Sequence, residues 1–161
     1  MSILETRHVS WLDETACAAS AAALAARPGL GHAFIELHGP LGAGKTTFVR
    51  HLLQAIGVQG RVKSPTYAVM EPYDLESGAA DAAPWTIRHF DFYRFNDPQE
   101  WEDAGFRDVF AGPGLKLAEW PEKAEGLLPP ADLRITIEPT DGERREVRFD
   151  ACTPLGVALL G

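Results

Sequence analysis

The residues with the clearest chemical use lie in one short stretch, residues 38–50, which reads HGPLGAGKTTFVR. It contains Gly-x-x-x-x-Gly-Lys-Thr between Gly39 and Thr46, a pattern typical of loops that bind nucleotide phosphates. Glycines let the backbone N–H groups approach phosphate oxygens, and a helix that starts after the loop adds the positive end of its dipole. Lys45 would then reach the β- and γ-phosphates, and the Thr46 hydroxyl would ligate Mg²⁺.

The segments on either side of this loop decide whether the pattern is meaningful. Residues 34–37, FIEL, form a short apolar run that predicts a strand, and residues 47–56 carry apolar side chains at helical spacing. A glycine-rich turn that leads into a helix by chance is the alternative, and the strand in front of the loop disfavours it. Strand, loop and helix in this order indicate an α/β fold.

Two acidic residues stand at the ends of apolar runs further along the chain. Asp91 ends the predicted strand 85–91, and Glu119 ends the run 115–119. Because ligand-binding groups gather at strand ends in open α/β sheets, we expect both acids to converge with Thr46 on one Mg²⁺. One or two carboxylates suffice for a cation that also binds phosphate oxygens. On position alone, Asp91 would equally well cap the turn that follows it.

A short segment after the loop helix carries two hydroxyl groups on either side of Pro65. Ser64 and Thr66 occupy the place where a switch-like loop reaches the γ-phosphate in P-loop proteins, so they are candidates for sensing phosphate, metal or attacking water. A tight turn whose hydroxyls bond to their own backbone fits the spacing nearly as well.

The remaining patterns complete an α/β fold in a single domain, residues 1–161. We expect an Ala-rich helix over 15–26 capped by Asp13, a strand over 32–37, a hairpin of strands 67–73 and 85–91, and a short helix over 98–104. Alternating residues in 133–137 and 146–149 around Asp141-Gly142 indicate a second hairpin. These C-terminal strands would extend the sheet in antiparallel fashion, which makes the central sheet mixed.

The composition excludes several classes of protein. With 161 residues, 45% hydrophobic and 24% charged, the chain suits one ordinary core. Its net charge of -8 offers no basic footprint for nucleic acid, and we interpret the Arg144-Arg145 pair as a solvated turn. Two cysteines, Cys17 and Cys152, make no disulfide framework, which favours a reduced, cytoplasmic compartment. No apolar run approaches the roughly 20 residues of a membrane span. The five histidines lack ligand spacing and are assigned ordinary surface or core positions.

Taken together, the segments LGAGKTTFVR, VKSPTY, HFDFYR, GFRDVF and AEWPEK, in this order, resemble the TsaE family of small bacterial P-loop ATPases, formerly YjeE. The resemblance extends from about Thr15 to about Pro130 and implies a P-loop NTPase-type three-layer fold. It also implies a role in forming N6-threonylcarbamoyladenosine at position 37 of tRNAs that read ANN codons. In that family the ATPase works with TsaB and TsaD and supports turnover of their complex, so that tRNA is met only through the complex.

The resemblance also implies roles for individual residues. Thr46 and Glu119 would ligate Mg²⁺, and Asp91 would be the Walker-B-like acid that positions metal or activates water. Thr15 would contact the adenine side of ATP, and Trp120 corresponds to the family's tryptophan beside the metal-binding acid. Ser64 and Thr66 match the switch-like loop. The phosphates would be held by Leu41, Gly42, Ala43, Gly44, Lys45, Thr46 and Thr47.

Two features separate this chain from its expected relatives and from other P-loop proteins. Pro40 stands where the family usually has Asp, which removes a charge near the phosphates and fixes one φ angle. No arginine finger is identifiable, so we expect slow hydrolysis by the isolated chain, because such a cation is worth roughly 10³ to 10⁵ in rate.

Two alternative functions use the same loop. A small-molecule kinase would need an Arg-rich lid, and a nucleotide-dependent binding module would hydrolyse ATP only incidentally.

Overall fold

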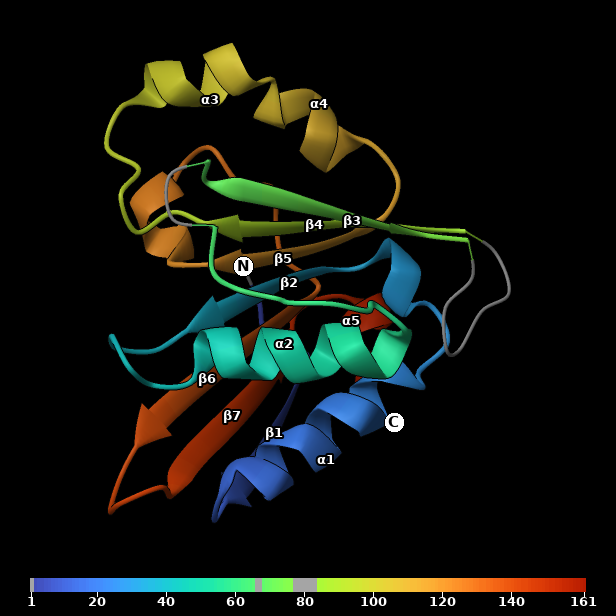
Figure 1. The fold of residues 1–161 in the computed structure, drawn as a ribbon, viewed down its shortest axis with the longest axis vertical. Coiled ribbons are helices and arrows are strands. Elements are labelled where there is room, and N and C mark those ends of the chain that lie inside the picture. The colour runs from blue at the N-terminus through green and yellow to red at the C-terminus, as the bar shows by residue number, and fades with distance from the viewer. Residues whose placement is uncertain (1, 66–67, 77–83) are drawn as a thin grey trace.

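The computed structural model describes residues 2–65, 68–76 and 84–161. These residues form one sheet of seven strands with helices on both faces, in the spatial order β1-β7-β6-β2-β5-β4-β3 (Figure 1). In chain order the elements are β1 (Glu5–Trp11), α1 (Glu14–Ala25), the 3-10 helix η1 (Leu30–His32), β2 (Phe34–His38), α2 (Lys45–Ile56), β3 (Met70–Leu75), β4 (Trp85–Asp91), α3 (Pro98–Ala104), α4 (Phe106–Ala111), β5 (Leu115–Glu119), the 3-10 helix η2 (Pro121–Ala124), β6 (Leu133–Pro139), β7 (Arg145–Ala151) and α5 (Pro154–Leu160).

The strand directions confirm the predicted mixed sheet. Strand β2 runs parallel to both β5 and β6, and β4 runs parallel to β5. Antiparallel strands close both sides, with β3 beside β4 at one edge and β7 followed by β1 at the other. In the register of the parallel strands, Glu119 lies opposite Leu37 on one side and Asp91 on the other. The carboxyl ends of β2, β4 and β5 therefore meet at one edge, immediately beside the glycine-rich loop.

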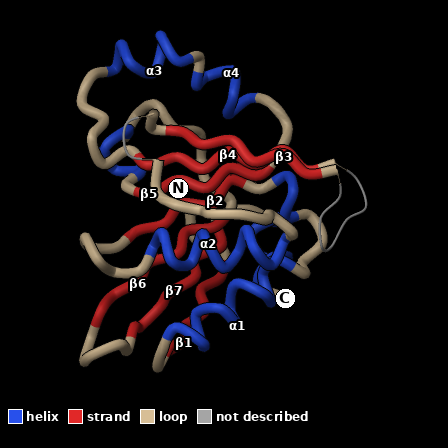
Figure 2. Tube along the Cα trace, viewed as in Figure 1, coloured by secondary structure: helices blue, strands red, loops and turns tan. Residues whose placement is uncertain are grey.

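Helices on the two faces of the sheet enclose two different cores, as the expected three-layer fold requires. Figure 2 shows α1 and α2 along one face and α3 and α4 near the β3–β4 end. Helix α2 buries its apolar stripe against the sheet, while the Ala-rich α1 packs closely beside α2. The opposite core is aromatic and joins β4 to α3 and α4, with Phe90, Phe92, Phe95, Trp101 and Phe106 buried in it.

Several element boundaries differ from the sequence expectations. Helix α1 begins at Glu14, and Asp13 is its N-cap as predicted, because its carboxylate accepts the Ala16 N–H at 3.0 Å. The strand expected from His32 starts only at Phe34, since Leu30–His32 forms η1. Strand β1 and the short helices α4 and α5 were not predicted. The strand predicted over 67–73 corresponds to β3, which begins only at Met70 and continues to Leu75; residue 67 lies outside the described part of the chain.

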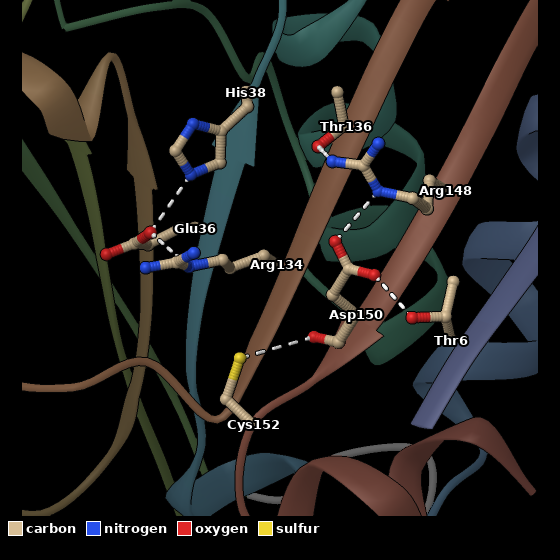
Figure 3. A network of polar contacts seen from close by, with 8 residues as sticks. All are labelled: Thr6, Glu36, His38, Arg134, Thr136, Arg148, Asp150 and Cys152. Atoms are coloured by element: carbon tan, nitrogen blue, oxygen red, sulfur yellow. Dashed lines mark hydrogen bonds and ion pairs between the residues drawn. The ribbon is translucent and has the colours of Figure 1, made fainter. Parts of the chain in front are cut away.

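The face of β6, β7 and β1 that α1 and α2 do not cover carries paired polar side chains (Figure 3). Asp150 accepts hydrogen bonds from Thr6 Oγ1 at 2.7 Å and from Arg148 Nε at 2.8 Å. Beside them, Glu36 lies 2.9 Å from His38 Nε2 and 3.3 Å from Arg134 Nε. Among the described residues, no helix is long and apolar enough to cross a membrane.

Candidate functional site

The glycine-rich loop joins β2 to α2, and its backbone geometry requires glycine at two points. A Cβ on Gly39 would lie 2.5 Å from the Ile137 carbonyl oxygen, and Gly44 has a φ of 107°. Helix α2 begins at Lys45, and among the described residues no side chain caps its N-terminus. Its first N–H groups are therefore available to an anion. Pro40 keeps the turn of the loop, because its carbonyl accepts the Ala43 N–H at 3.0 Å.

A pocket of about 540 Å³ opens over this loop. Every predicted site residue that the structure describes, except Thr15, lines the pocket, whereas Thr66 lies outside the described residues. The lining residues are Leu41, Gly42, Ala43, Gly44, Lys45, Thr46, Thr47, Ser64, Asp91, Tyr93, Arg94, Glu119 and Trp120. Segments far apart in the sequence thus form one cavity, and Tyr93 and Arg94 are lining residues that the sequence analysis did not identify.

Thr46 and Glu119 contact each other directly within this pocket. The Thr46 hydroxyl lies 2.8 Å from Oε1 of Glu119 and 3.1 Å from Oε2. Glu119 is only 2% exposed, because it ends the buried strand β5. A hydroxyl and a carboxylate in this arrangement provide oxygen ligands of the kind that Mg²⁺ prefers.

Asp91 and Ser64 form a second polar pair in the pocket. The Ser64 hydroxyl donates to Oδ2 of Asp91, and Oδ1 accepts the Tyr93 N–H at 2.9 Å. Asp91 therefore caps the following turn, as one alternative proposed, and at the same time lies opposite Glu119 on the neighbouring strand. The structure brings Ser64, Asp91, Glu119 and Thr46 together around one cavity.

Lys45 lies almost fully buried at the start of α2. Its Nζ donates to the Gly39 carbonyl and stands 3.5 Å from the centroid of the Trp120 ring. Burial lowers the pKa of Lys45, although the nearby carboxylates of Glu119, Glu122 and Asp91 oppose this shift. Trp120 has a left-handed backbone conformation with a φ of 55° and packs on Tyr93, with the two ring centroids 5.0 Å apart. The tryptophan thus forms a wall of the pocket as well as part of the core.

Arg145 contradicts the interpretation of Arg144-Arg145 as a solvated turn. Its Nε donates to the Ala43 carbonyl at 3.0 Å, so the C-terminal hairpin contacts the glycine-rich loop. Arg144 is exposed as expected and pairs with Glu146 on the surface. The adjacent pair gave no signal of this division, because Arg145 lies 102 positions from Ala43 in the sequence.

A smaller pocket of about 130 Å³ lies on the other side of the loop and shares Ala43, Gly44 and Thr47 with the first. Asp13, Glu14 and Cys17 of the α1 region line it, together with Trp11, Glu143 and Arg145. Thr15 is exposed on the same turn of α1 but does not line this pocket. Burial raises the pKa of the Cys17 thiol to about 11, so the thiol is uncharged at neutral pH.

Comparison with known proteins identifies the family. The model of the family described as "Threonylcarbamoyl adenosine biosynthesis protein TsaE" matches residues 11–147. This chain belongs to the TsaE family. The match runs from the end of β1 into β7, so it includes every residue that lines the large pocket.

Individual relatives agree with this assignment to the TsaE family. The chain is 46% identical over 126 residues to the tRNA threonylcarbamoyladenosine biosynthesis protein TsaE of Haemophilus influenzae, which covers 78% of this chain and 75% of that protein. It is 35% identical over 139 residues to the Bacillus subtilis protein of the same name, covering 86% and 80%. The crystal structure of Bacillus subtilis YdiB has the same fold, with a TM-score of 0.75, 24% identity and coverage of 99% and 95%.

Proposed function

We propose that this chain is a Mg²⁺-dependent ATPase that acts with TsaB and TsaD in threonylcarbamoyladenosine formation at position 37 of tRNA. The observation that carries the proposal is the Thr46–Glu119 hydrogen bond at the start of α2, in the same pocket as buried Lys45. These residues combine the phosphate-binding and metal-binding parts of a P-loop site. The family's name supplies the pathway.

In the proposed site, residues 41–47 hold the phosphates through backbone N–H groups. Lys45 leaves the Gly39 carbonyl when phosphate arrives and stabilises the charge that develops on the γ-phosphoryl group. The smaller pocket shares Gly44 and Thr47 with the first and would receive the adenosine end; Thr15 lies on the same turn of α1 as its lining residues. Asp91 orients the attacking water, and Ser64 holds the carboxylate of Asp91 in place through its hydrogen bond.

The residues in the pocket fit a magnesium ion. Thr46 and Glu119 would be its protein ligands and Asp91 a nearby partner, and such an ion needs only one or two carboxylates besides phosphate oxygens. The bound ion would neutralise part of the charge on the phosphates. The existing hydrogen bond already holds the Thr46 hydroxyl and the carboxylate on the same side of the pocket.

Support of a larger assembly fits the charge of the chain. A net charge of -8 disfavours direct binding to tRNA and suits a protein that docks onto an RNA-handling complex. Hydrolysis then drives turnover of the TsaB–TsaD complex, while the transfer of the threonylcarbamoyl group is performed by TsaD.

ATP hydrolysis by the purified chain, measured alone and with purified TsaB and TsaD, tests this proposal. We expect slow turnover alone and faster turnover with both partners. Lys45→Ala should lose most of its turnover both alone and with the partners. The same rate of ATP hydrolysis with and without TsaB and TsaD would refute the role in the complex. Phosphate transfer to a small acceptor in place of release would favour a kinase.

A further inference from the structure

His89 lies directly beneath the pocket, in a position that the proposed function does not use. It belongs to β4, and its side chain is 0% exposed. Its Nε2 lies 2.7 Å from Oε2 of Glu119, whose side chain is 3% exposed. The histidine does not line the pocket itself.

The two oxygens of Glu119 have different surroundings. Oε2 lies 2.7 Å from Nε2 of His89 and 3.1 Å from the Thr46 hydroxyl, whereas Oε1 lies 2.8 Å from the same hydroxyl. His89 thus contacts the carboxylate from below and Thr46 contacts it from the pocket side. Donors at two points restrict rotation of the carboxylate about its last bond.

The two ring nitrogens of His89 differ in their contacts. Nδ1 is buried and has no hydrogen-bond partner among the residues that the structure describes. A carboxylate oxygen only accepts hydrogen bonds, so the proton in the contact with Glu119 lies on Nε2, and the ring is the donor to Oε2.

We propose that His89 is a positioning residue for the metal site: its Nε2–H holds Oε2 of Glu119, so that the carboxylate faces Thr46 and the nucleotide-bound divalent cation. The inference rests on the proposed function, because the cation is that of the ATPase site. Histidine and carboxylate partners of metal ligands typically change metal affinity or activity about 10- to 100-fold when they are removed.

A purely structural role for His89 predicts different behaviour. Ile87 and His89 are two residues apart on β4, so their side chains lie on the same face of the sheet. Ile87 is an ordinary member of the apolar core. If His89 only filled space or paired a buried acid, its replacement would lower stability and weaken all ligands to a similar degree. A positioning role instead predicts weaker binding of the metal ion, with metal-free nucleotide affinity unchanged.

The experiment compares His89→Leu, which removes the donor, with His89→Gln, whose amide N–H can replace Nε2–H. Ile87→Ala serves as the matched control, because it disturbs the same face of β4 without touching Glu119. Mn²⁺ affinity in the presence of ADP is measured by electron paramagnetic resonance, and ADP affinity is measured in EDTA by calorimetry. Thermal unfolding of each variant reports on the fold.

We expect His89→Leu to bind Mn²⁺ about 10- to 100-fold more weakly with its metal-free ADP affinity unchanged, and His89→Gln to recover most of the loss. Equal Mn²⁺ affinity in His89→Leu and wild type would overturn the inference and leave the ATPase proposal standing. Equal losses in Ile87→Ala and His89→Leu would also overturn it. Wild-type protein that binds no Mn²⁺ with ADP would refute the proposed function, and with it the role of His89.

Discussion

The two halves of the sheet use their polar side chains in opposite ways. At the carboxyl ends of the parallel strands β4 and β5, Asp91 and Glu119 point into one pocket and meet residues of the glycine-rich loop. In the antiparallel half, Asp150 is bound by Thr6 and Arg148 on the strands β1 and β7 (Figure 3). In the first half the paired polar groups line a cavity, whereas in the second they pair on a face of the sheet away from that cavity.

The difference follows from how each half is covered. Strands β4 and β5 are largely buried, and their carboxylates stand where the strands end, beside the N-terminus of α2. Antiparallel strands leave one face in water, where alternating charged residues pair across the sheet. Substitutions in the parallel half should therefore affect activity, and those in the antiparallel half should affect stability.

The largest effect is expected at the loop. Lys45→Ala removes the buried cation that would face the phosphates in the proposed site, and the loss of such a group costs roughly 10² to 10³ in turnover. Steady-state hydrolysis with TsaB and TsaD measures the loss. Lys123→Ala is the control, because Lys123 stands 5.9 Å from the Tyr93 ring outside the pocket and should leave turnover nearly unchanged. Equal losses in both would show that Lys45 has no special role.

The second-largest effect is expected when the negative charge of Asp91 is removed. Asp91→Asn keeps an acceptor for the Tyr93 N–H but loses the carboxylate, so we expect turnover to fall about 10²-fold. Binding of ADP should change little. The matched control is Asp74→Asn on β3. The Asp74 carboxylate lies outside the pocket and pairs with Arg88, 2.9 Å from its Nη1. An active Asp91→Asn protein would remove this acid from the chemistry.

Arg145 joins the C-terminal hairpin to the glycine-rich loop, and its removal should lower activity less than the loss of Lys45 or Asp91. Arg145→Ala loses the hydrogen bond to the Ala43 carbonyl, and a charged donor is worth about 1.5 kcal/mol, or roughly a tenfold change in affinity. We expect weaker ATP binding and a smaller change in the turnover number. Arg144→Ala is an exposed neighbour for comparison, and similar behaviour of the two variants would argue against support of the loop by the hairpin.

The smallest effect concerns the antiparallel half alone. Burial by itself would raise the pKa of Asp150, but hydrogen bonds from Thr6 and Arg148 outweigh it and lower the pKa. A lowered folded-state pKa contributes stability above the unfolded value of about 3.9, and that stability is lost as pH falls through the folded pKa.

Thr6→Val should therefore reduce the free energy of unfolding by about 0.5 to 1.5 kcal/mol at neutral pH, with the difference shrinking in acid. Urea unfolding at pH 7 and near the carboxyl pKa measures this dependence, and ATP hydrolysis should be unaffected. A stability difference independent of pH would mean that Thr6 acts through packing and not through Asp150.

The sequence predicted the site where its parts are contiguous or end a strand. The glycine-rich loop was recognisable because its donors belong to consecutive residues, and Asp91 and Glu119 because each ends an apolar run. His89 and Arg145 were missed, since their contacts span 30 and 102 positions and neither residue ends a motif. Only strand register would have suggested His89, which lies on β4 two residues before Asp91.

The fold was predictable to a similar degree. Strands β4 and β5 and helix α3 have the expected bounds, because turn-forming residues or acids mark their ends. Strand β1 was missed because it is an edge strand whose side chains are mostly exposed, so it lacks the alternation of a half-buried strand. The six-residue α4 is too short for helical periodicity to be visible. The extent of the single domain stays a prediction.

The central claim, that the loop and the acid at the end of β5 form one metal–nucleotide site, is tested most directly by titrating ADP calorimetrically with and without Mg²⁺. The account predicts that Mg²⁺ tightens binding to wild type by roughly tenfold or more, about 1.4 kcal/mol, and has little effect on Glu119→Gln. The same Mg²⁺ enhancement in Glu119→Gln and wild type would contradict it.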